Sequence, residues 1–186
     1  MNEKNIIQLK TPLTKADMVN LEIGDILDLS GIIYTARDAA HKRMETAWKE
    51  KQALPVNLEN QFIFYAGPCP AKPGHAVGSI AATTSMRMDC FVEMTFELGA
   101  LGMIGKGERS EFVPDLCKRY GGVYLLGIGG ASALISKQVK SSVVVAWEDL
   151  GTESIKKLEV EKMRLVVGID IKGRVFQDRE IAKYRR

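Results

Sequence analysis

The stretch from Gly78 to Gly107 constrains the fold of this chain more than any other part of the sequence. It begins with small and hydroxyl-bearing residues, continues with helical spacing and ends on Lys106 between two glycines. The run of Ala, Thr and Ser is too polar and too unbranched for an ordinary core strand, yet its neighbours are apolar. This combination suggests a backbone that lies close to a small ligand.

The residues after this run predict a helix that Gly99 ends, because apolar side chains recur near i, i+3, i+4 and i+7. Thr83, Thr84, Ser85 and Arg87 then lie at or just before the helix N-terminus, where unpaired N–H groups favour an anion. Spacing alone favours a plainer interpretation, in which Thr84 or Ser85 caps the helix and Arg87 is solvated. The expected apolar face contains Met88, Phe91, Val92, Thr95 and Leu98.

The length and composition of the chain limit the classes of protein to which it can belong. A chain of 186 residues can bury a sizeable core, so we expect a single domain over residues 1–186. Its 46% hydrophobic and 26% charged content is ordinary for a soluble protein, and a net charge of +3 is too small to imply a nucleic-acid partner. No segment resembles a signal peptide or approaches the roughly 18 apolar residues that span a membrane. We therefore expect a cytoplasmic protein that uses no membrane.

The three cysteines are Cys69, Cys90 and Cys117, and they lie far apart without a C-x-x-C spacing. Only two histidines accompany them. Lone cysteines are usually small buried hydrophobes, so we expect no metal site in this chain. A cluster held by the three thiols together remains an alternative. Their odd number fits a reducing compartment.

Strand and helix signals alternate along the chain, and hairpin signals occur near both ends. This order predicts an α/β fold with a mixed sheet and helices packed on it. We expect strands in 5–10, 25–38 (one or two, around a Ser30–Gly31 turn), 61–67, 121–130 and 143–147. We expect a turn with a short helical segment in 11–25, and helices in 37–54, 108–120 and 131–139. The remaining expected features are a stiff loop in 67–79, a hairpin in 164–178 and a charged tail in 180–186.

Two residues near the start of the helix in 37–54 are candidate site residues. Arg37 projects where a strand ends and a helix begins, a favoured position for ligand contacts in α/β folds. Its alternative is a surface arginine paired with an acid, which the sequence alone favours. His41 has a side chain suited to acid–base work, but a histidine that hydrogen-bonds a neighbouring loop is the more frequent case, and we favour it.

Four motifs occur together in a characteristic order: ARDAAHKR, TTSMRMD, MIGKG and YGGVYLLGIGGASA. With them, roughly residues 8 to 175 resemble the β subunit, or C-terminal domain, of the iron–sulfur hydro-lyases, namely the class I fumarases and L-tartrate dehydratases. The resemblance implies a swivelling β/β/α domain with a mixed central sheet flanked by helices. Departures are Ala81, Ala82, Met86, Ala131 and Cys69, and a bulky Met86 could narrow the site.

The resemblance also implies a function. The chain would be the β subunit of an enzyme that reversibly adds or removes water on a small dicarboxylate, fumarate to (S)-malate first. It would be active only with a separate α subunit that holds a [4Fe–4S] cluster. Thr83 matches the proposed catalytic base, and Arg37, Thr84, Arg87 and Lys106 match substrate-binding positions. Alternatives are an L-tartrate dehydratase β subunit and a non-catalytic module that binds a dicarboxylate or another anion.

The residue types agree with that chemistry. A hydro-lyase must grip two carboxylates, remove a carbon-bound proton and assist the departing hydroxyl with a Lewis acid. Arginine meets a carboxylate with a planar fork and lysine adds a compact charge, so Arg37, Arg87 and Lys106 suit the first task. A threonine is a weak base at its ordinary pKa, so Thr83 would need help from neighbouring cations or would act as a relay. The Lewis acid is not expected in this chain.

Overall fold

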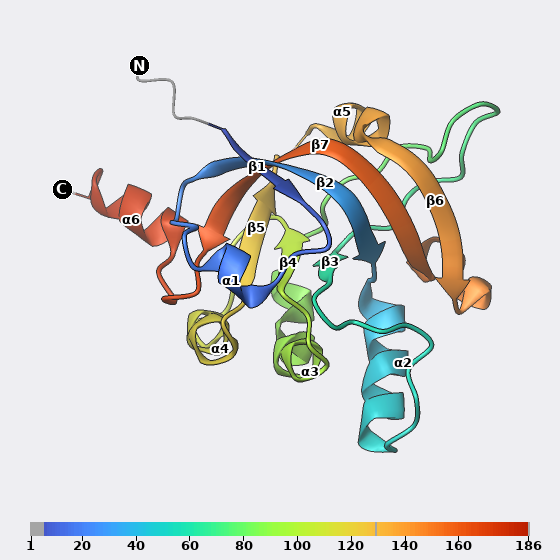
Figure 1. Cartoon of the computed structure of the whole chain (residues 1–186), viewed down its shortest axis with the longest axis horizontal. Coiled ribbons are helices and arrows are strands. Elements are labelled where there is room, and N and C mark those ends of the chain that lie inside the picture. Colours follow the sequence, from blue (N-terminus) through green and yellow to red (C-terminus); the bar gives the residue numbers. More distant parts are fainter. Residues whose placement is uncertain (1–5, 129, 186) are drawn as a thin grey trace.

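A seven-stranded mixed sheet organises the protein (Figure 1). The computed structural model describes residues 6–128 and 130–185. Residue 5, where we expected the first strand to begin, lies outside this range. The elements are β1 (Ile7–Lys10), α1 (Lys15–Met18), β2 (Ile26–Thr35), α2 (Asp38–Lys49), β3 (Phe62–Phe64), the 3₁₀ helix η1 (Met86–Phe91), α3 (Val92–Glu97), β4 (Gly102–Gly105), α4 (Val113–Tyr120), β5 (Val123–Gly127), α5 (Ser132–Gln138), β6 (Val139–Ala146), the 3₁₀ helix η2 (Glu148–Glu153), β7 (Ile155–Ile169) and α6 (Phe176–Ala182).

The strands run in the order β1-β2-β3-β4-β5-β7-β6. The first five are mutually parallel, whereas β7 is antiparallel to both β5 and β6. The long strand β7 also pairs with β2 in antiparallel register, from Ile26↔Val166 to Thr35↔Lys156. Strands β2, β3, β4, β5 and β7 therefore form a closed cycle of pairings. The predicted mixed sheet flanked by helices is confirmed, and the swivelling assignment remains a prediction.

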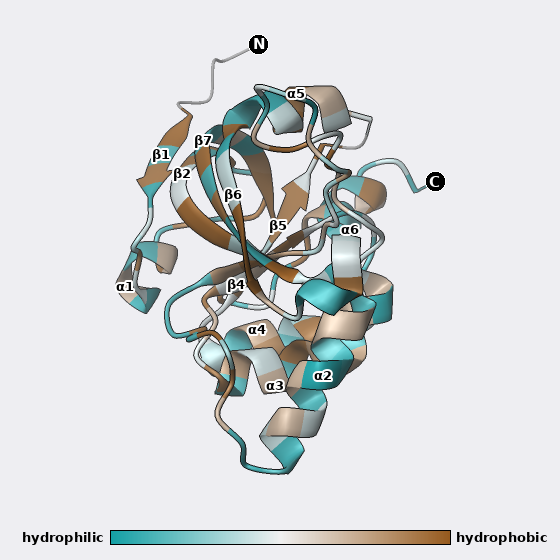
Figure 2. Cartoon of the chain, turned by 90° about the vertical axis from the view of Figure 1, so that its right-hand side faces the viewer, coloured by the Kyte–Doolittle hydropathy of each residue, from teal (hydrophilic) through white to brown (hydrophobic). Residues whose placement is uncertain are grey.

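Two hydrophobic clusters lie on opposite sides of the parallel strands. Phe64, Ile104 and Leu125 point into the space enclosed by the closed cycle of strands, together with Leu29 and Leu165. On the other side, α2, η1, α3 and α4 pack against the alternate strand residues, and Figures 1 and 2 show these helices gathered on one side of the sheet. Burial on both faces explains why the central parallel strands β3, β4 and β5 lack charged residues and are almost entirely buried.

Two local predictions were wrong. Ser30 and Gly31 do not form a turn, because β2 continues through them with a shift in its register against β7. Gly31 has φ of 102°, and a Cβ atom there would lie 2.2 Å from Thr11 Oγ1, so only glycine fits this irregularity. The predicted C-terminal hairpin is reduced to one bridge, Ile169↔Val175, and α6 (Phe176–Ala182) contains the end of the predicted hairpin and the first residues of the expected tail.

The predicted helix after Ser85 is present, but its first part is the 3₁₀ helix η1 and only Val92–Glu97 is α-helical. Ser85 occupies the N-cap position without capping through its side chain. The plainer interpretation of this serine is therefore wrong. Within the described residues, no helix is long and apolar enough to cross a membrane.

Candidate functional site

The candidate site lies at the carboxyl ends of the parallel strands. Strands β2, β3 and β4 are neighbours and run in the same direction, so the residues that follow them meet at one edge of the sheet. Arg37 follows β2, Tyr65 follows β3 and Lys106 follows β4. Ligands bind most often at the carboxyl ends of the strands in sheets of parallel strands.

Arg37 is the N-cap residue of α2, and its side chain is 27% exposed. Its Nη2 lies 3.6 Å from Glu153 Oε1 at the end of η2, while its buried Nε has no hydrogen-bond partner among the described residues. A Cβ atom on Gly67 would lie 3.0 Å from Arg37 Nη1, so the loop after β3 passes directly beside this guanidinium. The arginine is paired with an acid, as the sequence alone favoured, and it still projects at the edge of the sheet.

Arg87 forms a two-point contact with the first residue of α2. Its Nε donates to Asp38 Oδ1 and its Nη2 to Asp38 Oδ2, both at 3.1 Å. Burial alone would raise the pKa of Asp38, but the hydrogen bonds from Arg87 and the backbone outweigh it, so this pKa lies below its ordinary value. The contact joins the motif around Arg87 to the motif around Arg37. The Arg87 side chain is 49% exposed, so it is solvated as the plainer interpretation expected, and it is also paired with Asp38.

Thr83 and Lys106 are joined through the backbone. The Lys106 N–H donates to Thr83 O at 3.2 Å and to Ser85 Oγ at 3.0 Å, and the Ser85 N–H donates to Lys106 O at 3.0 Å. Thr84 and Lys106 therefore form an isolated parallel bridge beyond the end of β4. The Thr83 hydroxyl donates to Tyr65 O at 3.0 Å. Within the described residues, the Lys106 ammonium has no ion-pair partner, and its side chain is exposed.

These contacts bring all five predicted site residues to one edge of the sheet. Arg37 and Arg87 meet around the first turn of α2, and Thr83, Thr84 and Lys106 meet beyond β4. The loop after β3 links the two groups, because Tyr65 binds Thr83 and Gly67 lies beside Arg37. The arrangement presents three cations and at least one hydroxyl around a short stretch of strand ends. It is suited to binding a small anion.

His41 is buried below Arg37 and has a structural contact. Its Nδ1 lies 2.9 Å from Arg37 O, and because a carbonyl only accepts, Nδ1 carries the proton. The ring packs against Tyr65 and Phe91 with centroids 5.4 Å away in both cases. Burial lowers the pKa of His41 to about 4, and the charge of Arg109 acts in the same direction. His41 thus has a structural contact, as we favoured, but its partner is the N-cap carbonyl of its own helix and not a neighbouring loop.

The cysteines do not fit an iron–sulfur cluster or another metal. No group of three or more His, Cys, Asp or Glu side chains in the described part of the chain is arranged to hold a metal ion. Cys69 and Cys90 are exposed, whereas Cys117 is buried on α4. Burial raises the pKa of Cys117 to about 12, so this thiol resists forming the thiolate that ligates iron. A cluster held by the three thiols together is thus unsupported.

Sequence reasoning missed a buried polar network beneath the site. Arg109 and Asp89 form an ion pair whose side chains are 2% and 3% exposed. The Tyr124 hydroxyl donates to Ser85 Oγ at 2.9 Å. Asp89 belongs to the TTSMRMD motif, which was the one available signal, but Arg109 and Tyr124 lie 20 and 35 positions further along. No local periodicity connects residues at such distances.

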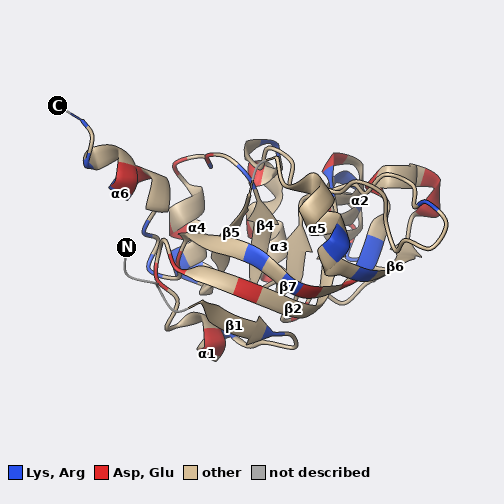
Figure 3. Ribbon diagram, turned by 90° about the horizontal axis from the view of Figure 1, so that it is seen from above, with Lys and Arg blue, Asp and Glu red and all other residues tan. Residues whose placement is uncertain are grey.

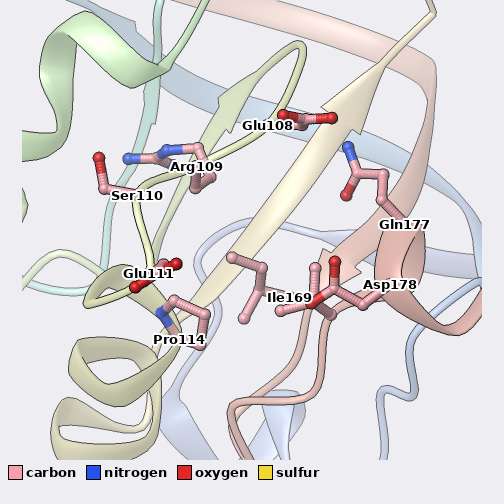
Figure 4. Close-up of a pocket in the computed structure, with 9 residues that line it drawn as sticks. Glu108, Arg109, Ser110, Glu111, Pro114, Ile169, Gln177 and Asp178 are labelled. Carbon is pink, nitrogen blue, oxygen red and sulfur yellow. The ribbon is translucent and has the colours of Figure 1, made fainter. Parts of the chain in front are cut away.

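A separate hollow of about 330 Å³ lies between the loop after β4, the start of α4 and α6. Glu108, Glu111 and Asp178 contribute carboxylates to its wall, and Figure 4 shows them around the opening. None of the five predicted site residues lines this hollow. Its acidic wall would repel an anion, so it is a poor candidate for the anion site.

Charges elsewhere are interspersed. Figure 3 shows basic and acidic positions next to one another on β7 and β2, where Arg164 pairs with Asp28. Arg43 and Asp149 form another pair between α2 and η2.

Comparison with known proteins identifies relatives that match most of the chain. A family model described as the fumarase C-terminus matches residues 1–179. The aerobic class I fumarate hydratase of Escherichia coli K12 is 35% identical over 174 residues, which are 91% of this chain and 32% of that enzyme. The chain thus spans about a third of the fumarate hydratases that it matches.

Shorter relatives match over most of their own length. The L(+)-tartrate dehydratase subunit beta of Escherichia coli K12 is 31% identical over 170 residues, which are 89% of this chain and 83% of that subunit. The putative L(+)-tartrate dehydratase subunit beta of Methanocaldococcus jannaschii is 36% identical over 167 residues, with 87% and 86% covered. The similarity therefore includes both a domain of longer enzymes and separate subunits.

Proposed function

Because the chain belongs to the family of fumarase C-terminal domains, we propose that it is the β subunit of a hydro-lyase that reversibly adds water to fumarate to form (S)-malate. In this proposal residues 1–186 act as one domain, which agrees with the match to separate subunits over more than four fifths of their length. The observation that carries the proposal is the meeting of Arg37, Arg87 and Lys106 at the carboxyl ends of the strands. A dicarboxylate requires cations at two points, and this edge provides them.

Arg87 is already oriented for a carboxylate. Asp38 accepts from Nε and Nη2, which lie on one edge of the guanidinium, and leaves the Nη1 side for a second partner. Arg37 has a similarly incomplete contact, since only Nη2 approaches Glu153. In our proposal each arginine is held by a carboxylate of the chain and binds a substrate carboxylate with its remaining donors. Lys106 adds charge, and Thr84 adds a hydroxyl next to it.

Thr83 is proposed as the residue nearest the proton transfer. Its hydroxyl donates to Tyr65 O, so the oxygen's lone pairs remain available to accept from a substrate group. A backbone carbonyl cannot take the proton permanently, and an alkoxide at Thr83 would need the neighbouring charge of Lys106. We therefore propose that Thr83 acts as a base only in the completed site, or relays the proton.

In our proposal the Lewis acid comes from outside this chain, and the arrangement of the described cysteines, which does not fit a cluster, supports this. We propose a partner α subunit that holds a [4Fe–4S] cluster and covers this edge of the sheet. Apolar side chains beside the cations support the covering. Met86, which precedes Arg87, is 48% exposed, and Ile128, which follows β5, is also 48% exposed. The complex would operate in the cytoplasm.

A second candidate substrate is L(+)-tartrate. The two tartrate dehydratase subunits are covered over more than four fifths of their length, whereas the fumarate hydratases are covered over about a third. Separate subunits of this size therefore favour tartrate, while the binding residues suit either diacid. A non-catalytic anion-binding module remains the outcome if neither diacid is converted.

The test uses the complex reconstituted anaerobically with its cluster-bearing partner, and substitutes Arg87→Ala. Loss of a two-point carboxylate contact should reduce kcat/KM at least about thirtyfold, on the scale of 2 to 5 kcal/mol for a desolvated charge pair. Arg119→Ala is the matched control, because Arg119 pairs with Glu93 on an exposed surface of α4. Unchanged turnover in the Arg87 variant would disprove the assigned role, and fumarate and tartrate are assayed in parallel.

A further inference from the structure

The buried ion pair of Asp89 and Arg109 lies directly under the two segments that carry the cations. Arg109 Nε donates to Asp89 Oδ1 at 2.6 Å, and the backbone N–H of Ser110 donates to Asp89 Oδ2 at 2.6 Å. The guanidinium carbon lies 4.5 Å from the Tyr124 ring centroid and 5.6 Å from that of Tyr65. Figure 4 shows Arg109 directed away from Glu108, its neighbour in the loop.

The position of the pair in the sequence relates it to the site. Asp89 lies in η1, two residues after Arg87, and Arg109 lies three residues after Lys106. These segments otherwise meet through the bridge between Thr84 and Lys106. The ion pair joins the two segments a second time, beyond Arg87 in one and beyond Lys106 in the other. It therefore limits how far Arg87 can move relative to Lys106.

A second buried contact acts on the same two segments. Ser85 is fully buried and its Oγ accepts from both the Lys106 N–H and the Tyr124 hydroxyl. A Cβ atom on Gly105 would lie 1.8 Å from this Oγ, so the serine is seated directly against the end of β4. Side chains from η1, from β5 and from the loop after β4 thus hold the two segments together at two places.

We propose that Asp89 and Arg109 are positioning residues that fix the spacing between Arg87 and Lys106 for a dicarboxylate. The proposal rests on the proposed function of this site. A buried ion pair contributes little net stability compared with apolar residues of similar volume, because both charges lose their hydration. It does impose a defined geometry when every donor and acceptor is engaged, and binding sites need their groups placed within about 0.5 Å.

The test replaces the pair with neutral hydrogen-bonding residues, Asp89→Asn/Arg109→Gln, in the reconstituted complex. The probe is succinate, a dicarboxylate that cannot be hydrated, and its Kd is measured by calorimetry alongside the KM and kcat for fumarate. Displacement of one cation by about 1 Å should weaken succinate binding and raise KM by about tenfold or more, with a smaller change in kcat. A succinate Kd and KM within about twofold of the parent would overturn the proposal.

The matched control is Asp170→Asn/Arg174→Gln. Asp170 is fully buried and its pair with Arg174 measures 2.7 Å, but it follows β7 beside Tyr124 and Ile169, near the start of β5. This is the amino-terminal end of the parallel strands, whereas the site lies at their carboxyl ends. This variant should lower the Tm while leaving the succinate Kd unchanged. Equal weakening of succinate binding in both variants would mean that the Asp89–Arg109 pair acts only through overall stability, and would also overturn the proposal.

Two further measurements cover the remaining outcomes. If the double variant does not fold, Arg109→Lys decides, because lysine keeps the charge but lacks the fork. It should weaken succinate binding at least about fivefold, and parental affinity would overturn the proposal.

Hydrogen exchange of the Lys106 amide is followed in the chain by itself. Faster exchange there, with no change at Leu165 in β7, supports positioning even if the parent complex converts neither diacid, in which case only the proposed function fails.

Discussion

His41 makes the stability of this protein depend on pH in a range where the carboxylates contribute little. Its Nδ1–H donates to Arg37 O, and its Nε2 is buried with no hydrogen-bond partner among the described residues. Protonating Nε2 would place a second donor among the rings of Tyr65 and Phe91, beside the charged Arg109. The folded protein therefore resists protonation, and the unfolded chain does not.

The magnitude follows from the two pKa values. Burial lowers the pKa of His41 from 6.5 to about 4 in the folded protein, so between these values the unfolded chain binds more protons. Stability is complete above the unfolded pKa and is lost as the pH falls toward the folded pKa. The full loss is about 3 kcal/mol, of which about 2 kcal/mol falls between about pH 7 and about pH 5.

The assay is urea unfolding followed by the fluorescence of the two tryptophans, at about pH 7 and about pH 5. The variant His41→Leu replaces the imidazole with an apolar side chain of comparable size and so removes the titrating group. The parent should lose about 2 kcal/mol more than the variant over this interval. An equal loss in both proteins would refute the assignment of a buried neutral histidine.

Two further predictions concern packing around the site and in the core. Gly105→Ala should destabilise the protein by about 1 to 3 kcal/mol, because its Cβ would lie 1.8 Å from Ser85 Oγ. Adding Ser85→Ala should recover part of this loss in urea unfolding, since the next contact, to Ser85 Cβ, is 3.1 Å away; no recovery would contradict the clash. Leu125→Ala, in the enclosed core, should cost about 3 kcal/mol, and Val143→Ala, 59% exposed on β6, under about 0.5 kcal/mol. Similar losses for the last two would contradict the described core.

Much of the order of elements could be predicted because it depends on local patterns, but the short strand β4, with two glycines among its four residues, was not predicted. Apolar periodicity and glycine stops located α2, α4, β5 and the helix after Ser85 within a few residues. The pairing of β7 with β2 could not be predicted, since it joins strands more than a hundred positions apart. That pairing is also why β2 continues through Gly31, where local signals indicated a turn.

The candidate site was predicted as far as its motifs are local. Arg37, Thr83 and Lys106 lie together because each follows or adjoins the end of a parallel strand. The sequence indicated this only for Arg37, since β4, which places Lys106, was not predicted as a strand. The acids that hold the arginines were not predicted, since Glu153 reaches Arg37 from the far end of η2. Arg109 was overlooked because a single arginine in a charged segment gives no sign that it will be buried.

The most direct test of the account is the hydration of fumarate by this chain mixed anaerobically with a cluster-bearing partner, against each component alone. A site shared between the two chains predicts formation of malate only in the mixture. Arg87→Ala in this chain should then abolish it while the two proteins still associate. Conversion of fumarate by the partner alone, at the rate of the mixture, would contradict the claim that this chain supplies the carboxylate-binding half of the site.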